Sequence, residues 1–319
     1  MQSMVESARV AAVAMGQVFA LVAIGFWLQR RGWFTTEVIG ALTRLSIDVA
    51  LPALAVVSLV KREPFTSYGG SWSMPLLFVG MLAVGLAVGW VFSRGLPVPE
   101  RRAFAALVGF PNAGYLPLPI AAALLPAAEA REAYTLIFLF ILGFGPMMWS
   151  LGVWLLIGHR GQGADWTECL TPPLIATIVA LALVAVGWDR HIPDAVLQPM
   201  RWLGDCVIPL VMLVLGGILG EFAVRRAVSW GVLTRLTVAK LIVMPCVILV
   251  GLRCMPVDRL VAFVLVIEAA VPPATSLAII ARRYSASQEL LIAQGMVVTY
   301  LASVITVPCF LALSGLLGR

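Results

Sequence analysis

The chain has 319 residues, of which 61% are hydrophobic and only 12% are charged, and its mean hydropathy is +1.00. An ordinary soluble domain has roughly 25% charged residues, so this composition excludes a soluble enzyme, a nucleic-acid-binding module and a disordered chain. The net charge of +6 comes from basic residues in short groups between apolar runs, which is the pattern of a membrane protein rather than of a nucleic-acid partner.

Ten apolar runs are each long enough to cross a bilayer as a helix, since a span needs about 20 residues. In chain order they cover residues 10–28, 40–60, 73–93, 103–125, 133–157, 170–187, 199–220, 231–252, 260–281 and 290–313. The first run could also be a signal peptide, but Arg30 and Arg31 follow it and no small-residue cleavage site stands out. The sequence therefore predicts an all-α integral membrane protein with ten transmembrane helices.

An internal repeat divides these runs into two sets of five. The pattern Arg-x-x-x-Asp-x-x-x-Pro occurs at 44–52 in the second run and again at 201–209 in the seventh. The same offset of 157 residues also brings the fourth run onto the ninth. Because five is an odd number of spans, the second unit starts on the opposite side of the membrane, which predicts inverted repeats of residues 1–159 and 160–319.

The broken helices of inverted-repeat transporters mark the substrate site, and two runs here carry breaks at corresponding positions. The fourth run contains GFPNAGYLPLP and the ninth contains EAAVPPATS. Each proline removes a backbone donor, and unpaired backbone at membrane depth is tolerated where it lines a cavity. The alternative is a pair of kinks that only shape the packing. The predicted substrate-binding residues are Pro111, Asn112, Gly114, Tyr115, Pro272, Pro273, Thr275 and Ser276.

Few charged side chains lie inside the predicted spans, and these are candidates for proton or ion coupling because such residues are expensive in lipid. Glu268 lies one turn before Pro272, where it could carry a proton or fill a gap left by the prolines. Asp48 and Asp205 each follow an arginine by four residues, so an ion pair within the helix is the expected role and ion coupling is the alternative. Lys240 is expected to extend its long side chain toward the interface.

No catalytic or cofactor site is indicated. The five cysteines include no CxxC pair, the histidines have no matching metal ligands, and no Walker A motif is present. Serine, histidine and acidic residues do not converge at a spacing suited to nucleophilic catalysis. We therefore expect neither an enzyme, nor a bound metal, nor a cofactor.

Several stretches resemble the auxin efflux carrier family, which includes plant PIN-type carriers and bacterial malate and malonate permeases. They are LPALAVVSL, FPNAGYLPLPI, PPLIATIVALAL, LGDCVIPLVMLVLGGIL and IEAAVPPATSLAIIARRY, and they lie in both halves. The resemblance implies the bile-acid symporter type of fold, with a scaffold domain of helices one, two, six and seven and a transport domain of helices three to five and eight to ten. It also implies crossed, broken helices four and nine and a homodimer. Pro111, Asn112 and Pro272 match its most specific motifs.

The sequence thus predicts a secondary transporter that moves a small organic anion, a carboxylate, by an elevator-like alternating-access motion. Partial positive charge at half-helix N-termini would favour such an anion. The expected drive is the membrane potential, a proton gradient or simple exchange. Sodium coupling is the rival within transport, and a membrane sensor that binds without transport is a second rival. The predicted location is the bacterial inner membrane. The positive-inside rule favours both termini outside, because the opposite side carries more arginines.

Overall fold

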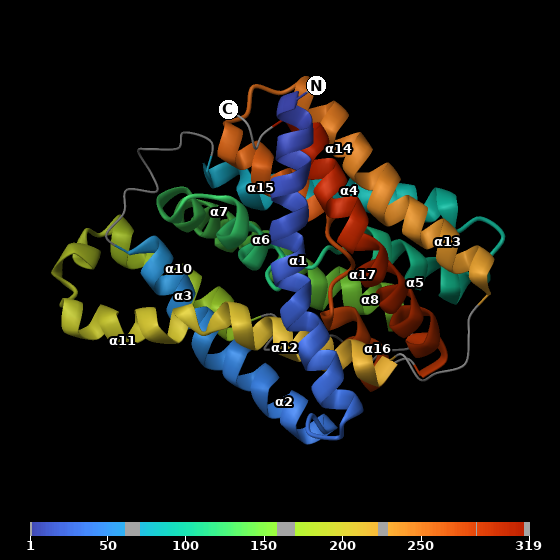
Figure 1. Ribbon diagram of the computed structural model, residues 1–319, viewed down its shortest axis with the longest axis horizontal. Helices are drawn as coiled ribbons and strands as arrows, with labels where there is room; N and C mark the ends of the chain where they lie inside the picture. The colour runs from blue at the N-terminus through green and yellow to red at the C-terminus, as the bar shows by residue number, and fades with distance from the viewer. Residues whose placement is uncertain (1, 61–70, 158–169, 223–228, 285, 316–319) are drawn as a thin grey trace.

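The structure is a computed structural model that describes residues 2–60, 71–157, 170–222, 229–284 and 286–315 (Figure 1). The regular elements of these residues are all helical. The α-helices are α1 (Gln2–Arg30), α2 (Thr36–Arg44), α3 (Leu51–Leu59), α4 (Met74–Phe92), α5 (Val98–Gly109), α6 (Pro117–Leu124), α7 (Ala127–Met147), α8 (Val153–Ile157), α10 (Pro172–Ala185), α11 (Asp194–Asp205), α12 (Val207–Phe222), α13 (Trp230–Val238), α14 (Met244–Arg253), α15 (Arg259–Ala270), α16 (Ser276–Tyr284) and α17 (Ala286–Ser314).

Within the described residues, seven helical stretches are long and apolar enough to cross a membrane. They are Arg9–Arg30, Thr36–Leu59, Met74–Phe92, Ala127–Ile157, Asp194–Glu221, Trp230–Arg253 and Gln288–Ser314. The sixth predicted run contains α10, which is apolar but has only 14 residues. The fourth and ninth runs are each divided into two helices, α5 with α6 and α15 with α16. The predicted boundary between the repeats, at residue 159, lies outside the described residues.

Prolines also alter the long spans without ending them. Three π-helical turns occur within a turn of a proline: η1 (Leu45–Ala50) before Pro52, η3 (Met148–Gly152) after Pro146 and η6 (Ala239–Val243) before Pro245. A proline has no N–H and its ring clashes with the carbonyl four residues earlier, so the widened turns η1 and η6, which precede their prolines, relieve the conflict. η3 follows Pro146, so this cause does not apply to it. Such turns change which face of the helix the following side chains occupy.

The helices fall into two groups that meet where α1 packs on α17 and where α3 and α10 contact α7. In one group α1 packs along α12, α2 also contacts α12, and α3 packs against α10 and α11; in the other, α4, α5, α7 and α13–α17 pack together (Figure 1). The contact between α1 and α12 is exceptionally close, because a Cβ atom on Gly216 would lie 2.0 Å from the carbonyl oxygen of Val22. Only glycine permits this separation.

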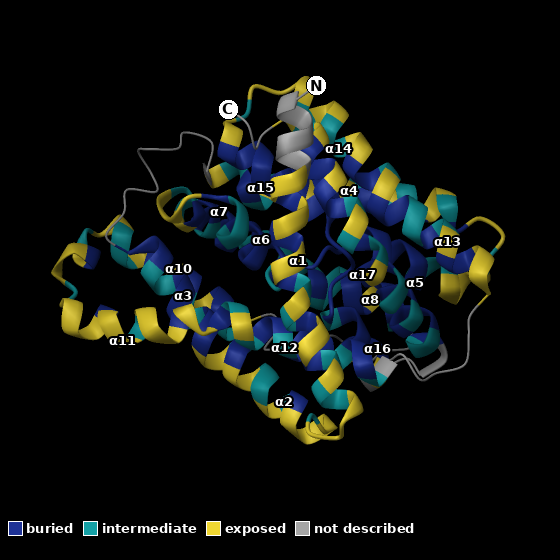
Figure 2. Cartoon of the chain, in the orientation of Figure 1, coloured by how far each residue is buried: buried dark blue, intermediate teal, exposed yellow. Residues whose placement is uncertain are grey.

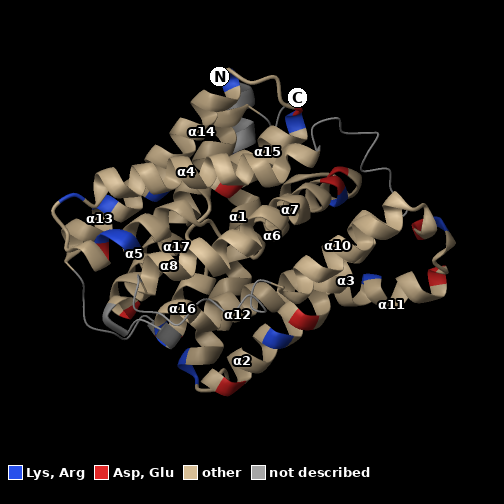
Figure 3. Ribbon diagram, turned by 180° about the vertical axis from the view of Figure 1, so that it is seen from behind, with Lys and Arg blue, Asp and Glu red and all other residues tan. Residues whose placement is uncertain are grey.

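The centre of the second group is buried on all sides. Every residue of α15 from Leu260 to Ala270 is buried, as is every residue of α5 from Ala103 to Gly109 (Figure 2). Large apolar side chains are instead exposed on the outer helices, as expected where lipid is the solvent. Charged residues lie mostly near helix ends and loops, with long uncharged stretches between them (Figure 3). The buried helices α5 and α15 lead directly into the two breaks.

Candidate functional site

The two breaks have the same local cause. α5 ends at Gly109, and Phe110 takes an extended conformation before Pro111. α15 ends at Ala270, and Val271 takes an extended conformation before Pro272. A proline disfavours the helical conformation of the residue that precedes it, so both helices end where the sequence places these prolines. We call residues 110–116 the first unwound segment and residues 271–275 the second unwound segment.

The two unwound segments lie antiparallel and satisfy one another's backbone. Asn112 N donates to the Pro272 carbonyl at 2.9 Å, and Ala274 N donates to the Phe110 carbonyl at 3.0 Å. These bonds form an isolated bridge between Pro111 and Pro273. Buried peptide groups need such partners because water is absent at this depth. The breaks are therefore one structural unit built from distant parts of the chain, and not independent kinks.

The side chain of Asn112 connects this unit to α17 by a hydrogen bond. Its amide group donates to the hydroxyl of Tyr300, and the Tyr300 hydroxyl donates to the Pro273 carbonyl at 3.2 Å. The amide oxygen of Asn112 accepts from Tyr115 N at 2.9 Å. Asn112 is 3% exposed and Tyr300 is fully buried. One asparagine and one tyrosine thus tie both unwound segments to a third helix.

An inner cavity of about 180 Å³ lies against both unwound segments. Five of the eight predicted binding residues line it: Asn112, Gly114, Tyr115, Thr275 and Ser276. The three predicted prolines do not line it and instead shape the backbone. The rest of the wall is mostly apolar and includes Leu51, Phe144 and Trp149. The structure brings the predicted polar groups of the two halves to one small, largely apolar cavity.

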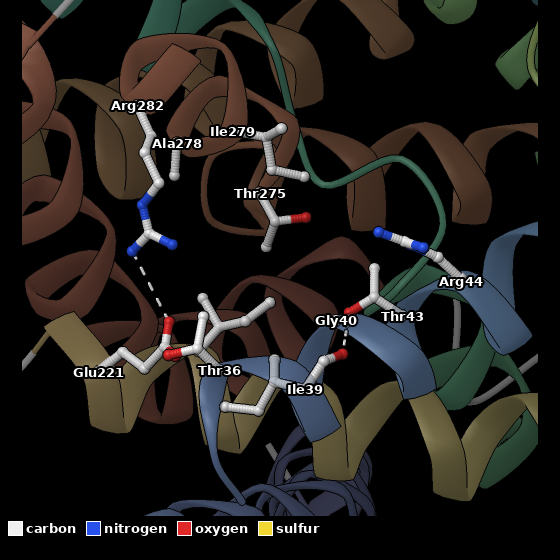
Figure 4. Close-up of a pocket in the computed structure, with 11 residues that line it drawn as sticks. Thr36, Ile39, Gly40, Thr43, Arg44, Glu221, Thr275, Ala278, Ile279 and Arg282 are labelled. Carbon is white, nitrogen blue, oxygen red and sulfur yellow. Dashed lines mark hydrogen bonds and ion pairs between the residues drawn. The ribbon is translucent and has the colours of Figure 1, made fainter.

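An outer cavity of about 530 Å³ lies between α2, α12 and α16 and shares Thr275 and Ile279 with the inner cavity (Figure 4). Its lining residues are Thr36, Ile39, Gly40, Thr43, Arg44, Ile218, Glu221, Thr275, Ala278, Ile279 and Arg282. Arg44 and Arg282 approach it from opposite sides in Figure 4, with Thr275 between them. The shared residues make the two cavities adjoining compartments.

The two arginines of the outer cavity differ in their partners. Arg282 pairs with Glu221 of α12 at 3.7 Å and with Glu289 of α17 at 3.6 Å. Glu221 also accepts a hydrogen bond from the Thr36 hydroxyl at 2.7 Å. Arg44 makes no hydrogen bond or ion pair with any residue that the structure describes. The uncompensated positive charge of this cavity is therefore that of Arg44.

The expectation of ion pairs within the helices is wrong for both aspartates. Within the described part of the chain, neither Asp48 with Arg44 nor Asp205 with Arg201 comes within ion-pair distance, and Arg201 instead donates to Gln198 at 3.3 Å. Asp48 lies in the π-turn η1, which disrupts the regular four-residue spacing. It is within electrostatic range of Tyr115 in the first unwound segment, whereas Asp205 is within range of Tyr134 at the start of α7. Only Asp48 lies near the inner cavity.

The expectation that Lys240 extends to the interface is also wrong. Its side chain is fully buried in the π-turn η6. Glu268 is fully buried as well, in the last turns of α15 before the second unwound segment. Neither of the two lines the inner or the outer cavity. Glu268 therefore lies near the end of α15, just before the second unwound segment, and does not face either cavity.

Sequence reasoning did not identify Tyr300 or the position of Arg44. Tyr300 follows the break by many residues in an ordinary apolar run, so no local signal separates it from a core tyrosine. Arg44 was visible as part of the repeated pattern, but the pattern alone did not distinguish a cavity residue from a partner of Asp48. The available signal for Tyr300 was its hydroxyl group. A tyrosine within a predicted span needs a hydrogen-bond partner for that group.

Comparison with known proteins gives a family. A family model described as membrane transport protein matches residues 10–169 and 164–311. An uncharacterized transporter of Methanocaldococcus jannaschii is 25% identical over 287 residues, which cover 86% of this chain and 89% of that protein. Another uncharacterized transporter, from Methanothermobacter thermautotrophicus, is 25% identical over 66% of this chain and 69% of its own length. The protein PIN-LIKES 7 of Arabidopsis thaliana is 28% identical over 38% of this chain and 34% of its own length.

Proposed function

The chain belongs to the membrane transport protein family, that of the auxin efflux carriers, and we propose that it is a secondary carrier of a small organic anion, a carboxylate. This is a family of transporters and not a class of enzymes. The observation that carries the proposal is the inner cavity, where backbone breaks from both halves meet with Asn112, Tyr115, Thr275 and Ser276. Irregular backbone beside a cavity at membrane depth is the usual setting of a carrier's substrate site.

The chemistry of the two cavities favours an organic anion. Arg44 supplies an uncompensated positive charge in the outer cavity, and the hydroxyl groups of Thr275 and Ser276 are potential donors in the inner one. α16 begins at Ser276, so its N-terminal end adds partial positive charge on the same side. Apolar side chains form most of the remaining walls. A carboxylate attached to a small apolar body fits this combination.

The motion we propose is an elevator-like alternating access between two domains made from inverted repeats of residues 1–159 and 160–319. The scaffold comprises helices one, two, six and seven, which correspond to α1, α2 with α3, α10, and α11 with α12. The packing of α1 on α12 and of α3 on α10 and α11 supports this grouping. The transport domain comprises the other helices and carries both unwound segments as a unit. A homodimer through the scaffold in a bacterial inner membrane, with both termini outside, completes the proposal.

Proton coupling is part of the proposal, and Glu268 is its principal candidate because it is fully buried next to the second unwound segment. Asp48 is a second candidate because of its position near Tyr115, and Asp205 is the weakest of the three. Sodium coupling is the rival within transport. A membrane sensor is the rival from another class, and it would bind the anion without moving it.

The test is uptake of radiolabelled malonate and indole-3-acetate into proteoliposomes, with empty liposomes as the blank. A carrier gives saturable uptake that exceeds the blank and competes with unlabelled substrate. Imposed proton and sodium gradients then distinguish the two coupling ions. Saturable binding to the purified protein without any uptake would contradict the carrier and support the sensor.

A further inference from the structure

Two ionisable side chains, one basic and one acidic, are fully buried outside both cavities. Lys240 and Glu268 are each 0% exposed, and they lie within electrostatic range of one another. Neither the Lys240 ammonium nor either Glu268 oxygen has a hydrogen-bond partner among the residues that the structure describes. Buried polar groups of this kind are normally bonded, so each unbonded one calls for an explanation.

The energetic cost of this arrangement is high. Taking an ammonium and a carboxylate out of water is only partly repaid by their mutual attraction, and a pair without supporting hydrogen bonds repays it least. An apolar pair of similar size would stabilise the fold better. Ionisable residues at membrane depth are accordingly associated with ion or proton pathways. The pair therefore points to a function that needs charge at this place.

The position of the pair links it to the candidate substrate site. Glu268 lies two residues before the end of α15, and Val271 begins the second unwound segment. Lys240 lies in the π-turn η6, a local geometry that is frequent at functional sites. η6 packs against both α15 and α5, the two helices that lead into the breaks. A change of charge on this pair would act on the helices that hold the unwound segments.

The remaining titratable groups of the surrounding helices are peripheral or already bonded. α4 and α6 carry none, and the buried hydroxyl of Tyr300 on α17 is bonded to Asn112 and Pro273. The others are Glu100, Arg101 and Arg102 on α5, Glu129, Arg131, Glu132 and Tyr134 on α7, Arg235 on α13, Cys246 and Arg253 on α14, Arg259 on α15, and Glu289 and Cys309 on α17. None of these is among the fully buried side chains. In the described structure, Lys240 and Glu268 are thus each other's buried charged neighbour.

We propose that Lys240 and Glu268 form a proton-binding site that makes the carrier an electroneutral symporter of one proton with a monovalent carboxylate. This rests on the carrier function proposed above and names its coupling ion and the charge of its substrate. In the empty protein, the Lys240 ammonium and the Glu268 carboxylate cancel. In the loaded protein, one proton binds to the Glu268 carboxylate, the Lys240 ammonium keeps its charge, and that charge balances the substrate anion.

The physical advantage is that the moving domain crosses the membrane without net charge at this site in either state. A net charge moved through lipid is costly and also responds to the membrane potential. The lysine also opposes the sodium alternative. A sodium ion near Glu268 would have to approach a fixed ammonium of the same sign in a medium of low dielectric constant.

The first experiment does not need a substrate. Infrared spectra of the protein in lipid vesicles are recorded as the pH is raised from mildly acidic to mildly alkaline. We expect a protonated-carboxyl band that disappears on titration and is absent from Glu268→Gln. Glu129→Gln is the matched control, because Glu129 is exposed and pairs with Arg259, and it should retain the band. Identical titrating bands in the parent and Glu268→Gln would overturn the proton site whether or not the protein is a carrier.

The second experiment tests the coupling with labelled indole-3-acetate, a monoanion, in proteoliposomes. At one-to-one coupling, a proton gradient of one pH unit supports roughly tenfold accumulation. A potassium diffusion potential should leave uptake by the parent unchanged. Lys240→Met leaves the loaded site negative, so an inside-negative potential should slow its uptake. Uptake by the parent that follows the potential or a sodium gradient, or a Lys240→Met protein as insensitive as the parent, would overturn electroneutral symport.

A double variant guards against misfolding. Removing one member leaves an unpaired buried charge, which is strongly destabilising, whereas Lys240→Met with Glu268→Gln removes both charges. We expect the double variant to fold at least as well as either single one and to lose stimulation by the proton gradient. Gradient stimulation equal to that of the parent would contradict the proposal. Absence of uptake by the parent itself would count against the proposed carrier function, and the infrared result would still decide the proton site.

Discussion

The two unwound segments share a backbone geometry but differ in what their side chains do. In the first segment, Asn112 has both ends of its amide engaged, with Tyr300 and with Tyr115 N. In the second, Thr275 lines both cavities, and Ser276, which follows it as the first residue of α16, lines the inner one. The antiparallel backbone bonds hold the two segments together without any side chain. Asn112 of the first segment therefore connects the unit to α17, whereas Thr275 of the second makes no such connection and lines both cavities.

The two copies of the Arg-x-x-x-Asp-x-x-x-Pro pattern also differ in their surroundings. Arg44 faces the outer cavity and Asp48 lies near Tyr115. Their counterparts Arg201 and Asp205 are exposed residues of α11 that line neither cavity. Repeated sequence thus does not imply repeated function. The two copies meet different neighbours in the fold, and the neighbours decide what each residue does.

The largest effect is expected for Asn112→Ala. The substitution leaves Tyr115 N without its acceptor and removes the donor to the Tyr300 hydroxyl, which keeps its bond to the Pro273 carbonyl. An unsatisfied buried donor costs about 1–3 kcal/mol of the free energy of unfolding. We expect a lower melting temperature in detergent and a loss of uptake in proteoliposomes. A variant as stable and as active as the parent would show that Asn112 does not fasten the two segments.

Thr275→Val tests the second unwound segment. The side chains are similar in shape, so stability should hold, but the hydroxyl donor is lost. A hydrogen bond to a charged group is worth about 1.5–3 kcal/mol, so the KM for the carboxylate should rise roughly tenfold or more. Thr275→Ser keeps the hydroxyl and should remain close to the parent. An unchanged KM in the valine variant would remove Thr275 from the substrate site.

Tyr300→Phe distinguishes a role in stability from a role in substrate binding. The ring keeps its place in the core, while the bonds to Asn112 and to the Pro273 carbonyl are lost. We expect a loss of about 1 kcal/mol of stability, visible as a lower melting temperature, with a smaller change in KM than for Thr275→Val. The opposite ranking of the two KM values would assign Tyr300 to the ligand space.

The smallest effect is expected for Arg44→Gln against its repeat counterpart Arg201→Gln. A single positive charge in the wall of a cavity attracts anions at a distance, and salt screens this attraction. Initial uptake rates of Arg44→Gln should fall several-fold at low ionic strength and approach those of the parent at high salt. Arg201→Gln should match the parent throughout. Equal effects of both substitutions would indicate overall charge and not the cavity.

Much of the fold was predictable because its signals are local. Apolar runs of about 20 residues predict spans wherever they occur, and seven of the ten coincide with helices long and apolar enough to cross a membrane. The fourth and ninth runs are each divided into two helices, and the sixth contains a helix of 14 residues. A proline next to an extended residue ends a helix whatever surrounds it, which is why Pro111 and Pro272 located the breaks. Five of the eight predicted binding residues line the inner cavity for the same reason, since they flank those prolines.

What could not be predicted depends on contacts between distant residues. A lysine within an apolar run can extend to the interface or remain buried, and only the helices around η6 decide that Lys240 is buried near Glu268. The partner of the Asn112 amide is a tyrosine 188 residues away in the chain. The π-turn η1 likewise removed the spacing that an ordinary helix would have provided for Arg44 and Asp48.

By itself, the sequence determined that the protein is a helical membrane protein, where seven of its long apolar helices lie and where α5 and α15 end, because hydropathy and proline act on the nearest residues of the backbone. Only the tertiary structure decided that the two breaks form one bonded unit, that Tyr300 fastens it, that Arg44 faces a cavity and that Lys240 and Glu268 are buried together. The physical reason is that hydrogen bonding and burial depend on which surfaces meet, and packing brings together residues that no local pattern connects.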